Sequence, residues 1–247
     1  MSNILLNYFK PYFKFISHRK RISIALKALT IFSYILPYSN CYSQVNDTLY
    51  TFSVQKNLPA FHFGQCYIPS ALIALGTYSN KEETIINNEA IKSARDEHLP
   101  HFQTHIDDYL QYAPLLAGYA FAAGSPGKLW PYTKEVLVNE IILCISVKYI
   151  KHWSKVPSVV NGSYNAFPSG HTAQAFSAAT LFNDNFVRGR PWLQVLSYGS
   201  ASTVGVLRIL NNRHWTSDVI AGAGFGILSA KLSELIVNPR KTKKYSR

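Results

Sequence analysis

The sequence contains few charged side chains for its size. Asp, Glu, Lys and Arg make up 15% of its 247 residues, whereas soluble globular domains average about 25%. Apolar residues reach 47% and aromatic residues 14%, so disorder is excluded for most of the chain. The length fits one domain, or one domain with a targeting segment. A mean hydropathy of −0.02 is nevertheless low for a protein made largely of membrane-spanning helices.

Cysteine is scarce, and the sequence has no metal-binding pattern. Cys41, Cys66 and Cys144 show no metal-ligand spacing, and their odd number argues against a framework of disulfides. The chain has no dense set of His and Cys residues and no second carboxylate cluster that could hold a catalytic metal. We therefore expect a protein that works without a metal ion or another cofactor.

Acidic residues are missing from both ends of the chain. Residues 1–40 contain six Lys and Arg side chains and residues 240–247 contain five, without any Asp or Glu. The two ends therefore supply almost all of the net charge of +12, and the region between them is nearly neutral. A nucleic-acid-binding domain would spread its basic residues over a folded face, so the distribution argues against that class. Basic flanks around a neutral, apolar body are typical of a chain that is anchored in or crosses a membrane.

The first 44 residues have the order of a targeting segment. Basic residues precede an apolar stretch, Ile22–Leu36, which Lys27 interrupts and which small and polar residues follow. This order predicts a secretory signal, cleaved near Ser43, or a signal anchor; an amphipathic first helix of the fold is the alternative. We divide the chain into this segment (1–44), a main domain (45–239) and a basic C-terminal tail (240–247).

The body of the chain shows helical spacing of apolar residues and no alternating strand pattern of useful length. A polar segment with Ile at helical spacing, residues 81–98, predicts a surface helix. We expect an all-α fold, a membrane-embedded bundle of about six helices. The last helix carries Gly222, Gly224 and Gly226, which would allow close packing. The predicted bundle helices are Cys66–Tyr78, Tyr109–Gly127, Val136–Ile150, His171–Phe182, Trp192–Leu210 and Asp218–Leu235.

Three groups of residues near helix ends could act together on a phosphate. Ser and Gly at a helix N-terminus expose backbone N–H groups that bind anions, and Arg and Lys add positive charge. A His with an Asp four residues later can be held as an oriented nucleophile, and a second His can protonate a leaving oxygen. The pattern predicts metal-free phosphoryl transfer through histidine. The three groups are Lys148 with Lys151, His152 and Lys155; Pro168-Ser169-Gly170-His171; and Arg208, His214 and Asp218.

Each group by itself also has a structural explanation. An N-cap Ser, a His–Asp helix pair and a lysine that reaches the surface at a helix end are all common. In this order and spacing, however, the groups resemble the signature of the type 2 phosphatidic acid phosphatase superfamily: Lys-x6-Arg-Pro, Pro-Ser-Gly-His and Ser-Arg-x5-His-x3-Asp. The resemblance covers roughly residues 60–237, and Asp107–Pro114 is similar to a segment of the membrane-associated bacterial branch that includes lipid A phosphatases.

The resemblance implies a role for each residue of the motifs. His214 is the expected nucleophile, which forms a phosphohistidine, Asp218 orients it, and His171 is the general acid for the leaving oxygen. The family is independent of metal ions, in agreement with the residue pattern. The residues expected to bind phosphate are Lys148, Lys155, Ser169, Gly170 and Arg208.

Two positions depart from the family pattern. The Arg-Pro of the first motif falls on Lys155-Val156, with Pro157 one place late, and lysine lacks the bidentate fork of arginine. Leu207 stands where the family has the serine before its arginine. We expect consequences for rate and substrate preference but an active enzyme, because the nucleophile, its orienting carboxylate and the acid are all present.

The basic ends also predict the side of the membrane on which the site lies. The positive-inside rule keeps both ends in the cytoplasm. Cys66–Tyr78 would measure about 20 Å as a helix, short of the ~30 Å hydrocarbon core, so we expect it not to cross. The chain then leaves the cytoplasm through Ile22–Leu36, returns through Tyr109–Gly127 and leaves again through Val136–Ile150. The site, which follows this helix, therefore faces the periplasm, and the last helix returns the tail to the cytoplasm. We expect an inner (cytoplasmic) membrane protein. If Cys66–Tyr78 crosses as well, the site is cytoplasmic or the tail is external.

The resemblance implies a phosphoric monoester hydrolase acting on a lipid phosphate, and it favours lipid A at the 1- or 4′-position. The expected partners are the phosphorylated lipid and the membrane, and not nucleic acid. One alternative is an undecaprenyl diphosphate or phosphatidylglycerophosphate phosphatase. Another is a soluble periplasmic non-specific acid phosphatase, which the short helices and low hydropathy favour. A non-enzymatic membrane protein that retains the bundle is an alternative from another class.

Overall fold

The computed structural model describes residues 63–80, 86–160 and 162–238. The regular elements in these ranges are all helices, joined by loops, and no strand lies among them. The all-α prediction is confirmed. The predicted targeting segment, the basic tail and residues 81–85 of the predicted surface helix lie outside the described residues. The elements are η2 (Phe63–Cys66), α3 (Tyr67–Tyr78), α4 (Asn88–His98), α5 (Ile106–Leu110), α6 (Ala113–Ala123), α7 (Leu129–Ser154), α8 (Gly170–Phe182), η3 (Asn183–Val187), α9 (Pro191–Leu210) and α10 (Thr216–Val237).

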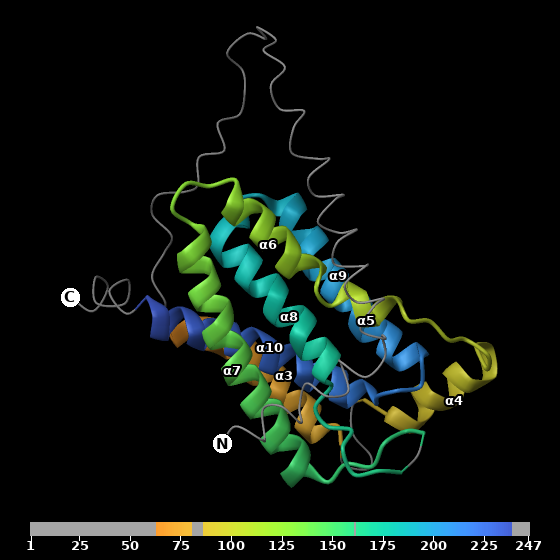
Figure 1. Cartoon of the computed structure of the whole chain (residues 1–247). Helices are drawn as coiled ribbons and strands as arrows, with labels where there is room; N and C mark the ends of the chain where they lie inside the picture. The colour runs from red at the N-terminus through yellow and green to blue at the C-terminus, as the bar shows by residue number, and fades with distance from the viewer. Residues whose placement is uncertain (1–62, 81–85, 161, 239–247) are drawn as a thin grey trace, which may run out of the picture. The chain divides into compact units, whose positions relative to one another are not determined.

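The longer helices form the bundle. Figure 1 shows α6, α7, α8 and α9 roughly side by side, with α3 and α10 together at an angle to them. Helix α10 is the central element, because it packs against α8, α3 and α7. The segment predicted as one helix over Tyr109–Gly127 is instead divided into the end of α5 and all of α6. Pro114 lies in the first turn of α6, where its missing N–H costs no hydrogen bond, and it could not occupy the middle of a continuous helix without breaking one.

Small residues let α8 and α10 approach closely. A Cβ on Gly226 would lie 2.2 Å from the carbonyl oxygen of Ala173, and one on Gly222 would lie 2.6 Å from that of Ser169. Gly224 makes a similarly close approach to α3. The glycine packing face predicted from the sequence is therefore confirmed, although it is divided between two neighbouring helices. The approach at Gly222 fixes the start of α8 against the first turns of α10.

The helix boundaries at this end follow from local chemistry. Ser169 has the extended backbone of an N-cap, and its side chain accepts the N–H of Thr172, so α8 begins at Gly170. Helix α7 ends where Lys155 adopts a left-handed backbone conformation, with φ of 50°. In the first turn of α10, Asp218 accepts the N–H of Trp215, which satisfies a donor that the helix itself leaves unpaired.

We predict that Gly226→Ala lowers the stability of the bundle, because the added methyl group meets a backbone oxygen that cannot rotate away. Overpacking of this kind costs about 1–3 kcal/mol. The matched control is Gly199→Ala on α9, where an added Cβ meets nothing within 4 Å, and where alanine should be neutral or stabilising by up to about 1 kcal/mol. Thermal unfolding of the detergent-purified protein measures both. Equal melting temperatures for the two variants would contradict the packing described here.

Candidate active site

Four helix ends meet at one end of the bundle, the lower end in Figure 1, where α7 and α9 end and α8 and α10 begin. The amide N–H of Ser169 donates to the carbonyl oxygen of Asp218 at 3.0 Å, which joins the start of α8 to the first turn of α10. The indole N–H of Trp215 donates to the carbonyl oxygen of Pro157 at 2.9 Å. The second and third sequence motifs are therefore in direct contact, and the connection after α7 is tied to them.

His214 and Asp218 face one another at the start of α10. Nδ1 of His214 lies 3.3 Å from Oδ2 of Asp218, and the same oxygen accepts the backbone N–H of Trp215 at 2.9 Å. The Asp218 side chain is fully buried, so its position is fixed. Burial lowers the pKa of His214, and the Asp218 carboxylate opposes that change. A neutral imidazole held at Nδ1 presents its other nitrogen, Nε2, for nucleophilic attack.

The start of α8 offers hydrogen-bond donors. The Ser169 hydroxyl oxygen accepts from the Thr172 hydroxyl at 3.0 Å and from the Thr172 backbone N–H at 3.5 Å. Because both contacts use the oxygen as an acceptor, the hydroxyl proton can be donated to a ligand. The N–H groups of Gly170 and His171 lie in the first turn of α8, where a helix supplies no acceptor of its own. This is the arrangement that binds anions at helix N-termini.

Arg208, in the last turn of α9, is held by acidic residues that the family signature does not contain. Its guanidinium donates to Oδ2 of Asp107 at 2.7 Å and lies 3.6 Å from Oδ1 of Asp108. Asn211 donates to the other oxygen of the buried Asp107 at 3.0 Å. Nε of Arg208 is buried and makes no hydrogen bond within the described part of the chain. That N–H is a donor suited to a phosphate oxygen.

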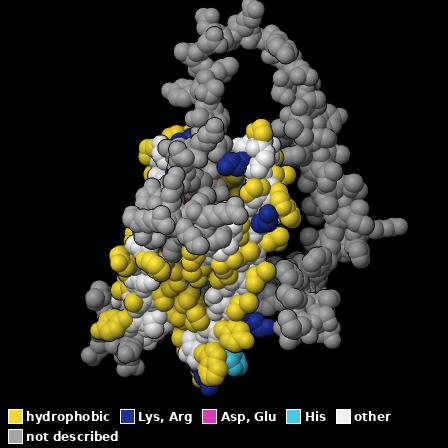
Figure 2. All heavy atoms as spheres, turned by 90° about the vertical axis from the view of Figure 1, so that its left-hand side faces the viewer, with side chains coloured by type: hydrophobic (Ala, Val, Ile, Leu, Met, Phe, Trp, Pro, Cys, Tyr) yellow, Lys and Arg dark blue, Asp and Glu magenta, His cyan; other side chains and the backbone are white. Residues whose placement is uncertain are grey.

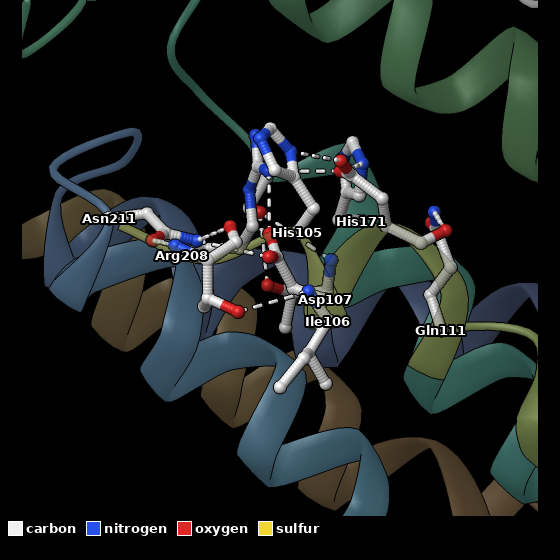
Figure 3. Close-up of polar contacts among 11 residues, drawn as sticks. His105, Ile106, Asp107, Gln111, His171, Arg208 and Asn211 are labelled. Carbon is white, nitrogen blue, oxygen red and sulfur yellow. Dashed lines mark hydrogen bonds and ion pairs between the residues drawn. The ribbon is translucent and has the colours of Figure 1, made fainter. Parts of the chain in front are cut away.

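The acidic residues come from α5, which lies between α8 and α9 at this end. Oδ1 of Asp108 lies 3.0 Å from Nε2 of His171. Figure 3 shows Asp107 and its neighbours at the start of α5, with Arg208 and Asn211 on one side and His171 on the other. In the sequence, Asp107 and Asp108 stood out only as part of a family resemblance, without a place in the site. Two adjacent carboxylates in a chain with few acidic residues were the signal that could have indicated one.

Lys151 belongs to the first group of residues found in the sequence, but it was not among those expected to bind phosphate. Its ammonium group donates to the carbonyl oxygens of Asn165 at 2.5 Å and Ala166 at 3.2 Å, just before the second motif. The charges of Asp218 and Arg208 both act on this ammonium group. Lys151 is therefore placed with the two charged residues of the third motif.

The two lysines expected to bind phosphate lie farther out. Lys148, one turn earlier on α7, is exposed, and so is Lys155, which follows the end of that helix. Their roles in binding phosphate remain predictions. Pro157, which stands one place late for the family's Arg-Pro, supplies the carbonyl oxygen that anchors Trp215.

Helix α4 supports the loop that carries the nucleophile candidate. Arg95 donates to the carbonyl oxygen of Leu210 at 2.8 Å, and Asn88 exchanges hydrogen bonds with Ser217 at 3.0 and 3.2 Å. A cavity between α4 and this loop is lined in part by His214, but not by Lys151, the start of α8 or Arg208. The cavity therefore lies beside the residues that could bind phosphate, Arg208 and Lys151, and not between them.

These groups together can perform phosphoryl transfer. Arg208, Lys151 and the start of α8 offer positive charge and donors suited to phosphate oxygens, and an imidazole is able to act as a nucleophile or as an acid. No group of three His, Cys, Asp or Glu side chains within residues 63–80, 86–160 and 162–238 could hold a metal ion. The metal independence implied by the sequence remains a prediction.

The profile of the PAP2 superfamily, the type 2 phosphatidic acid phosphatases, matches residues 84–241. A curated relative, the lipid A 1-phosphatase of Porphyromonas gingivalis, is 36% identical over 135 residues, which cover 53% of this chain and 30% of the relative. The chain therefore spans less than a third of the length of that protein.

Two solved structures resemble the fold. The crystal structure of Aquifex aeolicus LpxE matches with a TM-score of 0.47 and 20% identity, over 62% of this chain and 96% of that one. The first transmembrane PAP2-type phosphatidylglycerolphosphate phosphatase from Bacillus subtilis matches with a TM-score of 0.49 and 19% identity, over 72% of this chain and 99% of that one. Since the superfamily profile spans more than half of the chain and includes all three motifs, the family predicted from the sequence is confirmed, and this chain belongs to the PAP2 superfamily.

Proposed function

We propose that the protein is a metal-independent lipid phosphatase that hydrolyses a phosphate monoester through a phosphohistidine at His214. The observation that carries this proposal is the buried His214–Asp218 pair, held beside the guanidinium of Arg208 and the start of α8. Family membership supports it, because the matched region contains His171, His214 and Asp218.

Binding of the phosphate comes first. Nε of Arg208, the ammonium group of Lys151 and the N–H groups at the start of α8 donate to the phosphate oxygens and offset their charge. The Ser169 hydroxyl donates to one of the same oxygens. The buried ion pair with Asp107 fixes the direction of the Arg208 guanidinium before substrate arrives, so little conformational freedom is lost on binding.

Transfer to histidine follows. Nε2 of His214 attacks phosphorus, the bond between phosphorus and the ester oxygen breaks, and the Asp218 carboxylate stabilises the positive charge that forms on the ring. His171 gives its proton to the departing oxygen, so the product leaves as an alcohol. Water then attacks the phosphohistidine while neutral His171 accepts a proton from it. The bond between phosphorus and nitrogen breaks, and inorganic phosphate and free His214 are produced.

We propose the 1-phosphate of lipid A as the substrate. The similarity of Asp107–Pro114 to the branch that includes lipid A phosphatases favours lipid A, and the curated relative named above is a 1-phosphatase. The 1-position is therefore preferred to the 4′-position, which the sequence left open.

The outer surface of α7 supports embedding in a membrane. Exposed apolar side chains recur at every fourth position along it: Leu137, Ile141, Ile145, Tyr149 and Trp153. Figure 2 shows the side of the molecule that carries α7 as mostly hydrophobic. Trp130 and Trp153 are exposed near its two ends, about 35 Å apart at 1.5 Å per residue, a separation that suits the two interfaces of a bilayer.

Helix α10 alone, among the described helices, has both the length and the apolar composition for crossing a membrane, and 56% of that stretch is buried inside the bundle. A core helix would meet the same criteria. The exposed face of α7 and the basic chain ends therefore support the membrane location more strongly than α10 does.

We predict that the site faces the periplasm of the inner membrane. Alkaline phosphatase fused after residue 160 should be active, and a fluorescent reporter fused after residue 245 should fluoresce in the cytoplasm, because the basic ends are retained there. A cytoplasmic signal at residue 160 would refute the orientation. Release of the protein from membranes without detergent would instead support the soluble periplasmic alternative.

We predict that purified protein in detergent removes the 1-phosphate from lipid A, and that His214→Ala and His171→Ala each reduce the rate by about 10²–10⁴-fold or more. Mass spectrometry of the lipid product identifies the number and position of the phosphates. The exposed His101, outside the site, provides the control, and His101→Ala should retain wild-type activity.

The substrate and the mechanism can fail separately in this experiment. Lipid A that keeps both phosphates, with release of phosphate from phosphatidylglycerophosphate or undecaprenyl diphosphate, would reject the substrate but keep the chemistry. Wild-type rates in correctly folded His214→Ala protein would reject the mechanism.

We predict that Lys151 contributes more to phosphate binding than Lys148. Lys151→Ala should raise KM and lower kcat/KM by at least about tenfold, because it removes a charge next to Asp218 and Arg208. Lys148→Ala, one turn farther from the site, should have a smaller effect. Steady-state kinetics of the two variants decides between them, and a larger loss for Lys148→Ala would restore the assignment made from motif spacing.

A further inference from the structure

We propose that Asp108 is the positioning residue for the general acid: its carboxylate orients His171 and favours the protonated form of the ring, which gives its proton to the ester oxygen as that oxygen leaves. The inference depends on the proposed function and adds a residue that the three motifs do not include. It starts from the direct contact of 3.0 Å between Oδ1 of Asp108 and Nε2 of His171.

The charges around His171 explain why it requires such a partner. Burial, Arg208 and His214 all disfavour a positive charge on its ring, whereas Asp108 and, more weakly, Asp107 favour one. Asp107 already accepts hydrogen bonds from Arg208 and Asn211. Asp108 is therefore the carboxylate in direct contact with the acid, and the one whose removal leaves the ring facing mainly positive groups.

The exposure of the two aspartates agrees with different roles. The Asp107 side chain is 1% exposed and braces Arg208, whereas Asp108 is 43% exposed and also contacts the exposed His105. Asp108 is thus more open to solvent than Asp107 and Arg208. A partly exposed carboxylate such as Asp108 can act on His171 without adding a second buried negative charge to that of Asp107.

The chemistry of the leaving group gives a direct test. An alkyl or sugar oxygen is a poor leaving group and must receive a proton as its bond to phosphorus breaks. A nitrophenolate leaves without that proton. Damage to the acid should therefore slow an alkyl phosphate strongly and a nitrophenyl phosphate weakly, whereas damage to phosphate binding or to folding should slow both alike.

The experiment compares kcat for dodecyl phosphate and 4-nitrophenyl phosphate in wild-type protein, Asp108→Asn and Asp108→Glu. Asp108→Asn should lose at least about tenfold on the alkyl ester and no more than about threefold on the nitrophenyl ester. Asp108→Glu, which keeps the charge, should recover part of the alkyl activity. The alkaline limb of the rate profile for the alkyl ester should move to lower pH in Asp108→Asn, because the protonated ring has lost its negative neighbour.

Two further variants provide comparisons. Asp107→Asn should slow both esters and raise both KM values, because it releases Arg208. Glu97→Gln changes an exposed carboxylate on α4, outside the site, and should leave both rates unchanged.

Several results would overturn the inference. Equal losses on the two esters in Asp108→Asn would make the residue structural or part of phosphate binding. A lower KM with unchanged kcat would show that the carboxylate only occupies the phosphate position. If wild-type protein hydrolyses neither ester nor lipid A, the proposed function fails and this inference fails with it. An active wild type with uniform losses in Asp108→Asn rejects the inference alone.

Discussion

The structure of the site depends on one buried carboxylate. Asp218 is fully enclosed in the first turn of α10, where its side chain accepts the N–H of Trp215 and faces Nδ1 of His214. Its backbone oxygen accepts the N–H of Ser169, so the same residue also positions the start of α8. A buried carboxylate is stable only with such partners. Displacing Asp218 would therefore disturb the proposed nucleophile, His214, together with the start of α8.

The packing of the bundle brings the starts of α8 and α10 to the same place. Close contacts at Gly222 and Gly226 bring α8 onto α10 with their starts at the same end, so two helix N-termini contribute positive potential to one place. The few basic residues of the nearly neutral body then act locally. Arg208 and Lys151 gather at the same end of the bundle, while the basic residues at the chain ends are proposed to set its orientation in the membrane.

Much of this arrangement could be predicted from the sequence, because it is encoded locally. Helical periodicity located the bundle helices, and fixed spacing within single helices or caps revealed Ser169 with His171 and His214 with Asp218. Contacts between distant segments left no such pattern. Lys148 was preferred because it fits a motif spacing, whereas the contacts of Lys151 with the carbonyl oxygens of Asn165 and Ala166, just before the second motif, are visible only in the fold. Asp107 and Arg208 are 101 positions apart in the sequence, and Asp108 and His171 are 63 positions apart. Only the fold brings these pairs into contact.

Trapping the phosphorylated enzyme would identify the residue that receives the phosphoryl group. Purified protein would be mixed with a radiolabelled phosphate ester and stopped in alkali, in which phosphohistidine survives, and the labelled peptide would then be sequenced by mass spectrometry. The account predicts alkali-stable, acid-labile label on the peptide that contains His214, none in His214→Ala, and reduced label in Asp218→Asn. Undiminished label in His214→Ala, or label on another residue of the wild-type protein, would contradict it.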